Sequence, residues 1–170
     1  MFKRQKSIQA ILYILGKFTE RCTDMHKICK ILYFADQRHL SKYGRAITKD
    51  DYIKMPYGPV PSNIYDIFKN LNKEDVAGCL ERVNNFVIKA KADCDADYLS
   101  ESDVECLDYA IEECKNLSFT ELTNKSHTYA WNNTKDWDVI SPKDILREVD
   151  NNTEEFINFV VDKPIFKLAV

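Results

Sequence analysis

The stretch Ile28–Phe68 constrains the fold more than any other part of the chain, because it joins a long apolar helix to a stiff turn rich in proline. Mostly apolar residues share one face of this helix at the 3.6-residue period: Met25, Ile28, Cys29, Leu32 and His39. Further bulky side chains lie on its other sides: Ile31, Tyr33 and Phe34. We therefore expect this helix to form the centre of the fold and to pack against more than one neighbour.

Both ends of this helix carry boundary signals. Thr23 or Asp24 supplies a capping oxygen just before Met25. At the other end, Tyr43 is followed by Gly44, a residue that commonly ends helices in a left-handed conformation. The sequence thus predicts a helix from about residue 25 to 43.

The composition fits one domain. The 170 residues are 45% hydrophobic, which is enough to form a sizeable core. Only four glycines and five prolines are present, and no stretch is low in complexity, so a flexible linker has no obvious place. We expect a single domain over residues 1–170, with C-terminal helices within 141–162 packed on the rest.

We expect a cytoplasmic protein that does not enter a membrane. No run of about eighteen apolar residues occurs. Gly16, Lys17 and Glu20 interrupt the apolar start, whose helical spacing predicts a core helix over Ser7–Arg21. Because no small-residue cleavage site follows, the start is not read as a secretion signal, and the six cysteines are expected to be reduced.

Two short segments are predicted to be extended. Tyr52–Met55 suits a short strand, followed by a stiff turn over Pro56–Pro61 and a helix over Ser62–Leu71. Apolar and polar residues then alternate over Phe86–Lys91, which predicts a half-buried strand. Its partner is either the first strand or residues near Leu80.

The second half of the chain is predicted to be helical. Ser100 with Asp103, and Ser118 with Glu121, have the spacing of capping boxes. A further short helix is expected to begin at the signal formed by Ser141, Pro142 and Asp144, and another is expected to cover Thr153–Val161. The predicted fold class is therefore mainly α with a small antiparallel β-sheet, an α+β fold.

The net charge of −3 conceals an asymmetry. Residues 1–70 hold 13 Lys and Arg against 6 Asp and Glu, a balance of +7, whereas residues 71–170 hold 11 against 21, a balance of −10. Such a dipolar surface is suited to steering a charged partner, although solvated faces of mixed sign are the commoner explanation.

Asp36 is the first residue that calls for explanation. It falls within the apolar arc of the central helix, where an unpaired carboxylate would be costly. We expect it to be a structural anchor rather than a catalytic base, satisfied either by backbone amides and hydroxyls around Tyr57–Val60 or by Arg45. Tyr33 and Asp36 are assigned to a structural motif together with the proline-rich turn.

The opposite face of the same helix displays cations around an aromatic ring: Lys27, Lys30, Phe34 and Arg38. An aromatic side chain among charges is a frequent anchor of protein interfaces, so these four residues form the candidate partner-binding surface. The alternative is that a neighbouring helix covers Phe34.

The turn itself needs no ligand to explain it. Gly58 permits an unusual backbone angle, and Pro59 and Pro61 fix the direction of the chain after Tyr57. An anion at the following helix N-terminus is the weaker reading, because no phosphate-binding glycine motif occurs.

The sequence offers no metal site or catalytic centre that stands out. Cys22, His26 and Cys29 lie close together, but only His39, farther along the helix, could complete a zinc site. The run of aspartates from Asp93 to Asp97 lacks the glycine and glutamate of a calcium loop. We expect no enzyme activity, cofactor or metal; an enzymatic alternative would need Asp36, His39 and Tyr57 to converge on a cleft.

A nucleic acid is not expected to be the main partner. Helices followed by a strand pair can form a winged helix, and the basic first 70 residues would favour this. The isoelectric point near 5.7 and the acidic second half argue against it.

A set of motifs in a fixed order resembles one protein family. The run KILYFADQRHLSKYGRAIT is followed by YIKMPYGPVPSNIYDIF, LSESDVECLDYAIEE and LSFTELTNKSHTYAW. The late element supplies His127, Ala130 and Trp131. This order resembles the Panacea-domain proteins, also described as SocA-like or phage-associated GepA-like, over about residues 8–135.

The resemblance implies a cytoplasmic antitoxin that binds and blocks a toxin encoded by an adjacent gene, without covalent chemistry. Two alternatives accompany it: a regulator that binds the DNA of its own operon, and an adaptor that delivers the toxin to a AAA+ protease. For the adaptor, the apolar end Leu168–Val170 is a candidate degradation tag.

Overall fold

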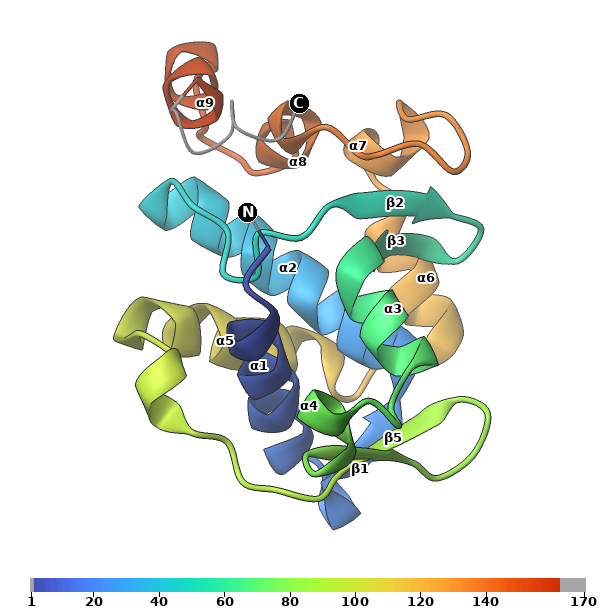
Figure 1. Ribbon diagram of the computed structural model, residues 1–170. Coiled ribbons are helices and arrows are strands. Elements are labelled where there is room, and N and C mark those ends of the chain that lie inside the picture. Colours follow the sequence, from blue (N-terminus) through green and yellow to red (C-terminus); the bar gives the residue numbers. More distant parts are fainter. Residues whose placement is uncertain (1, 163–170) are drawn as a thin grey trace.

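The longest helix, α2 (Met25–Tyr43), runs through the middle of the molecule (Figure 1). The computed structural model describes residues 2–162, apart from the side chains of residues 74 and 75. The Asp24 carboxylate caps α2 by accepting a hydrogen bond of 2.7 Å from the backbone N–H of Lys27. Gly44 ends the helix in the left-handed conformation, with φ 64°. Both predicted boundaries are confirmed.

The first helix, α1 (Arg4–Gly16), begins and ends earlier than predicted. After Gly16 the chain enters a short 3-10 turn, η1 (Thr19–Arg21), in which Glu20 and Arg21 have φ of 58° and 55°. An α-helix cannot contain this left-handed backbone, so the predicted extension to Arg21 is wrong.

The first sheet has three antiparallel strands in the order β1 (Cys22–Asp24), β5 (Val87–Ala90) and β4 (Leu80–Arg82). Ile88 of β5 lies opposite Thr23 on one side and Arg82 on the other. Of the two predicted pairings for this strand, the one with residues near Leu80 is therefore confirmed.

The second sheet is the hairpin of β2 (Tyr52–Met55) and β3 (Gly58–Pro61). The predicted turn over Pro56–Pro61 is wrong for its last four residues, which form this strand. Prolines are tolerated there because β3 pairs with a strand on one side only, so a missing N–H on its outer edge breaks no ladder.

The other predicted helices form in the predicted order, with the bounds α3 (Ser62–Lys69), α5 (Glu101–Cys114), α6 (Phe119–Ser126), α8 (Pro142–Arg147) and α9 (Glu154–Val161). Three short ones were not predicted: α4 (Glu74–Ala77), η2 (Ala96–Tyr98) and α7 (Tyr129–Asn132). Both predicted capping boxes form, at Ser100 with Asp103 and at Ser118 with Glu121. The α+β fold class is confirmed.

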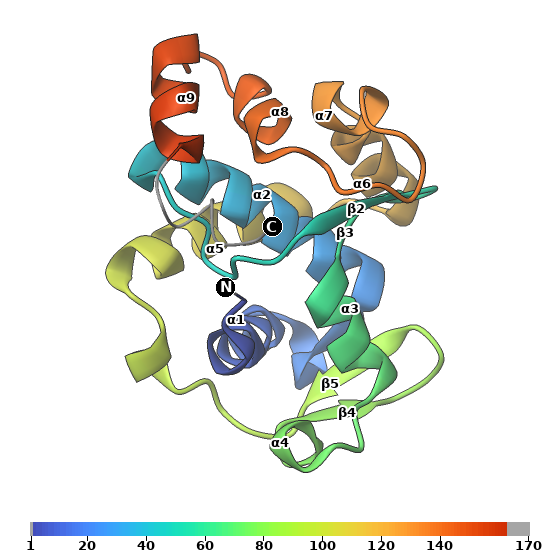
Figure 2. The same ribbon diagram turned by 45° about the horizontal axis from the view of Figure 1, so that its top comes forward.

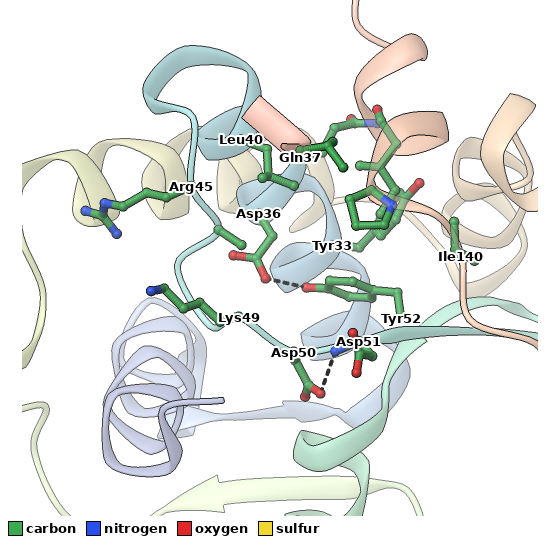
Figure 3. Close-up of a pocket in the computed structure, with 14 residues that line it drawn as sticks. Tyr33, Asp36, Gln37, Leu40, Arg45, Lys49, Asp50, Asp51, Tyr52 and Ile140 are labelled. Atoms are coloured by element: carbon green, nitrogen blue, oxygen red, sulfur yellow. Dashed lines mark hydrogen bonds between the residues drawn. The ribbon is translucent and has the colours of Figure 1, made fainter. Parts of the chain in front are cut away.

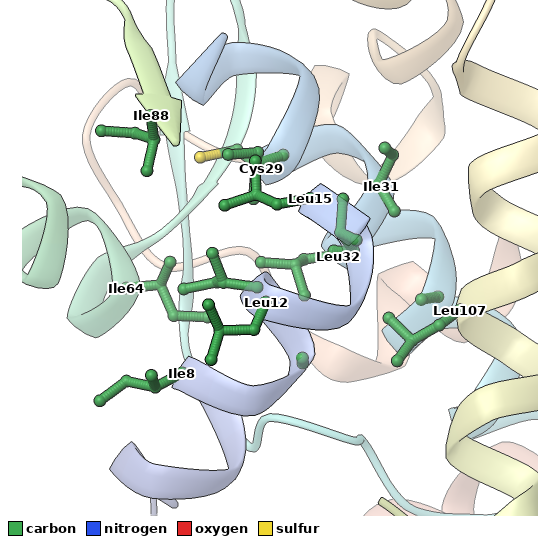
Figure 4. Packing of buried hydrophobic residues seen from close by; sticks show 14 of the residues in the cluster. Ile8, Leu12, Leu15, Cys29, Ile31, Leu32, Ile64, Ile88 and Leu107 are labelled. Atoms are coloured by element: carbon green, nitrogen blue, oxygen red, sulfur yellow. The ribbon is translucent and has the colours of Figure 1, made fainter. Parts of the chain in front are cut away.

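Helix α2 separates two cores. On one side it packs with α1, α3 and α5, where side chains such as Leu12, Leu32 and Leu107 meet (Figure 4). On the other side Tyr33 and Leu40 pack against apolar residues of α8 and α9. Figure 2 shows these two helices lying along α2. The expectation that α2 packs against more than one neighbour is confirmed.

Two further expectations concern membrane-spanning helices and the proposed degradation tag. None of the helices among residues 2–162 is long and apolar enough to cross a membrane. The proposed degradation tag, Leu168–Val170, lies outside the described residues.

Candidate partner-binding surface

Asp36 is buried and anchors the loop that returns along α2 (Figure 3). Its carboxylate accepts hydrogen bonds from the backbone N–H groups of Ile47 and Thr48, at 2.6 and 3.2 Å. The hydroxyls of Thr48 and Tyr52 also donate to it, at 2.5 and 2.9 Å. Burial raises the pKa of Asp36, while these hydrogen bonds act against the rise.

The expected partners of Asp36 were the wrong ones. Arg45 pairs with Asp103 at 3.0 Å instead, and residues around Tyr57–Val60 do not reach the carboxylate. Because Gly44 reverses the chain directly after α2, residues 47–52 pass over Asp36, as Figure 3 shows for Tyr52. The carboxylate thus acts as the structural anchor that was expected, through a different segment.

A pocket of about 260 Å³ adjoins this anchor and is lined by residues that include Tyr33, Asp36 and Tyr52 (Figure 3). His39 and Tyr57, the other two residues of the enzymatic alternative, do not line it. His39 is buried between the Arg45 carbonyl and the Ser102 hydroxyl, at 2.7 and 3.0 Å. The structure therefore does not bring this triad together.

Lys30 is fully buried, so its predicted place on an exposed binding face is wrong. Its ammonium donates to the carbonyl of Pro59 at 2.9 Å, beneath the hairpin. Burial lowers the pKa of Lys30 to about 8. Helical periodicity predicts which side chains share a face, but it does not show that a distant hairpin covers that face.

The hairpin turn fits closely over α2. Gly58 has φ 101°, a region that favours glycine, and a Cβ there would overlap the hydroxyl of Ser126 and lie 2.9 Å from the Lys30 Cε. Trp131 donates from its indole to the Met55 carbonyl at 3.0 Å. The family-like elements around Gly58 and Trp131 thus hold the hairpin in place.

An aromatic cluster marks the tip of this hairpin. Tyr57 is 61% exposed and meets the ring of Phe119 edge-on, with centroids 5.2 Å apart. His26 stacks on the same ring at 4.1 Å, and its Nε2 is 3.1 Å from the Tyr57 carbonyl. The pKa of His26 is lowered to about 4, mainly by burial and then by Lys30.

An open groove of about 510 Å³ lies along α2 on the side where α5 and α6 approach it. We call it the α2 groove and define it by its lining residues: Phe34, Gln37, Arg38, Ser41, Lys42, Tyr109, Glu113, Lys125 and Val149. The Arg38 guanidinium lies 3.8 Å from the centre of the Tyr109 ring. The Lys125 ammonium lies 5.5 Å from the centre of the Phe34 ring. The groove thus combines cations with aromatic faces, a composition typical of interface anchors.

Two of the four predicted binding residues, Phe34 and Arg38, line this groove. Lys27 lies outside it and donates to the Lys115 carbonyl at 2.9 Å, near the end of α5. Sequence reasoning missed the other seven lining residues, which include Lys42, Tyr109 and Lys125. Lys42 stands one turn after Arg38 and could have been found by helical spacing, whereas Tyr109 and Lys125 come from α5 and α6.

No group of three or more His, Cys, Asp or Glu side chains within the described part of the chain is placed to hold a metal ion. The six cysteines are free thiols.

Comparison with known proteins gives one family. The family model described as "Antitoxin SocA-like, Panacea domain" matches residues 28–132, which is more than half of the chain. The match runs from the start of α2 to the end of α7 and includes the hairpin and most of the α2 groove. No curated protein and no solved structure matches the chain.

Proposed function

We propose that this chain, which belongs to the family of SocA-like antitoxins with a Panacea domain, neutralises a toxin protein encoded by an adjacent gene by binding it directly. The observation that carries the proposal beyond the family is the α2 groove, where Phe34 and Arg38 remain available to a partner. The expected mechanism is occlusion of the toxin by steric and electrostatic contacts, without covalent chemistry.

The roles of the buried polar groups support binding rather than catalysis. Asp36 holds the loop after α2, Lys30 holds the hairpin, and His39 joins α2 to the start of α5. Each of these groups has its hydrogen-bonding capacity directed at the fold itself. The groove, in contrast, presents side chains outward on three helices.

The test begins with growth. Cells express the adjacent open reading frame alone, together with this chain, or with a matched vector lacking it, and the pair is then co-purified through a tag on the neighbour. The proposal predicts that the neighbour stops growth, that this chain restores it, and that the two proteins elute as one complex. A harmless neighbour, or rescue without a complex, would contradict it.

The same strains and purified proteins distinguish two further roles, that of a protease adaptor and that of an operon regulator. Rescue that requires a host AAA+ protease would assign an adaptor role. Binding to the upstream DNA, measured by gel shift at two salt concentrations, would assign operon regulation, since phosphate contacts weaken steeply with salt.

A further inference from the structure

We propose that Arg38 is the receptor for a carboxylate of the partner, so that an aspartate or glutamate side chain of the toxin enters the α2 groove beside Tyr109. This inference rests on the proposed function, which it deepens by naming the chemistry of the contact. The basis of the inference is the pairing of the charged groups in and around the groove.

Arg38 is the groove cation whose pairing is incomplete. Its Nη2 lies 4.0 Å from the Oε1 of Glu105, the carboxylate with which it forms an ion pair. Its Nε is buried and has no hydrogen-bond partner among residues 2–162. A guanidinium carries five N–H donors in a planar fork, and here most of that capacity is unused.

The neighbouring carboxylates make their short contacts with groups other than Arg38. Glu105 accepts from the Lys42 ammonium at 2.5 Å and, through its other oxygen, from the Tyr43 hydroxyl at 2.6 Å. Glu113 accepts from the Lys125 ammonium at 2.7 Å. The Arg38 guanidinium therefore has donor capacity left for a carboxylate of a partner.

The position of the guanidinium suits a carboxylate. Its Cζ lies over the Tyr109 ring, 3.8 Å from the ring centre, and this cation–π contact favours one position of the guanidinium beside the groove. Only about a third of the Arg38 side chain is exposed, at 37%, so little side-chain freedom is left to lose on binding. Two parallel N–H···O bonds to one carboxylate are the geometry that such a fork favours.

The surroundings favour a protein over a nucleic acid. A phosphate backbone needs a row of unpaired cations, but Lys42 and Lys125 each have a carboxylate within 2.7 Å. Glu105 and Glu113 would repel a chain of phosphates more strongly than a single carboxylate, because the chain carries more negative charges. Phe34, in the same groove, offers an apolar face to the methylene stem of that side chain.

The decisive experiment measures affinity for the co-purified neighbour by titration calorimetry with three variants. Arg38→Met should weaken binding by about tenfold or more, because a charge-assisted pair is lost. Arg38→Lys should recover only part of this loss, since an ammonium lacks the fork, and Arg38→Glu should weaken binding by roughly a hundredfold or more. Lys69→Glu is the control, because Lys69 also pairs with a ring and a carboxylate, at Tyr65 and Asp66, but lies outside the groove.

A charge swap identifies the partner side chain. Acidic residues of the neighbour are replaced by lysine one at a time. One of these replacements should restore binding to Arg38→Glu and weaken binding to the unmodified chain. Unchanged affinity of Arg38→Glu for a neighbour that still forms the complex would overturn the inference and leave the proposed function standing.

A second measurement remains decisive if the neighbour does not bind at all. The NMR signal of the Arg38 Nε–H is followed while acetylated tetraglutamate or an eight-nucleotide oligothymidine is added. The inference predicts that the peptide shifts this signal and that the oligonucleotide does not. No shift with the peptide, or a shift with the oligonucleotide alone, would overturn it.

Discussion

The ammonium of Lys30 donates a 2.9 Å hydrogen bond to the carbonyl of Pro59, across the contact between α2 and β3. A lysine in the middle of the central helix thereby fixes the hairpin that carries the exposed Tyr57 ring. The same region belongs to the stretch that the family model matches. The proline-rich motif thus serves the fold, whereas the proposed partner contacts lie on the neighbouring α2 groove.

Replacing Lys30 by methionine should remove a rise of stability with pH. Burial lowers the pKa of Lys30 to about 8, below its ordinary value of 10.5, so between these values the unfolded chain binds more protons than the folded one. Stability therefore rises with pH in this window. Relative to Lys30→Met, the intact protein should gain about 2 kcal/mol of unfolding free energy from pH 8 to pH 10 in urea titrations. A constant difference between the two proteins would contradict the buried ammonium.

Alanine at Gly58 should destabilise the protein. The backbone there has φ 101°, and the added Cβ would overlap Ser126 and crowd Lys30, so we expect a loss of about 2 kcal/mol or more. Gly16→Ala is the matched control, because nothing lies within 4 Å of its added Cβ. Urea unfolding of both variants tests this. Equal stabilities would mean that the hairpin does not pack as closely as described.

Asparagine at Asp36 should destabilise the fold by about 2–4 kcal/mol. The amide group would direct donors at the hydroxyls of Thr48 and Tyr52, which now donate to the carboxylate. Asp66→Asn on α3 is the control, since its exposed ion pair with Lys69 contributes at most about 1 kcal/mol. If Asp36→Asn instead loses toxin neutralisation at unchanged stability, Asp36 has a functional role.

Acid should weaken the packing of the hairpin tip through His26. Its pKa of about 4 is below the ordinary 6.5, so as pH falls through this window the unfolded chain gains protons that the folded chain resists. Stability is lost on acidification. His26→Gln should show a smaller drop of melting temperature between pH 6.5 and pH 5 than the intact protein. An equal drop would assign the acid sensitivity to other groups.

Local signals predicted much of this fold. The capping boxes at Ser100 and Ser118, and the boundary at Gly44, depend on residues within one or two turns of each other, and all formed as expected. The end of α1 was missed because apolar spacing continues to Phe18, whereas the left-handed backbone at Glu20 and Arg21 has no comparable signal.

The candidate surface was predictable only in part, because exposure is decided by distant segments. Lys30 and Phe34 are one turn apart on α2, yet the hairpin covers the first and the groove opens beside the second. Tyr109 and Lys125 reach that groove from helices whose packing against α2 cannot be read from local spacing. The charge asymmetry predicted a dipolar surface, but acidic side chains of the second half pair with cations of the first, such as Lys6 with Asp103 and Lys42 with Glu105.

Growth rescue by variants of the α2 groove tests whether this chain neutralises the toxin through that groove. Cells expressing the toxic neighbour receive the intact chain, the groove variant Phe34→Leu with Lys125→Ala, or the control Phe86→Ala with Lys69→Ala, whose residues lie outside the groove. All variants are first checked for equal protein levels and melting temperatures. Phe34→Leu is chosen because it preserves an apolar side chain. The account predicts rescue by the intact chain and the control but not by the groove variant. Full rescue by the groove variant would contradict it, because neutralisation would then occur through another surface.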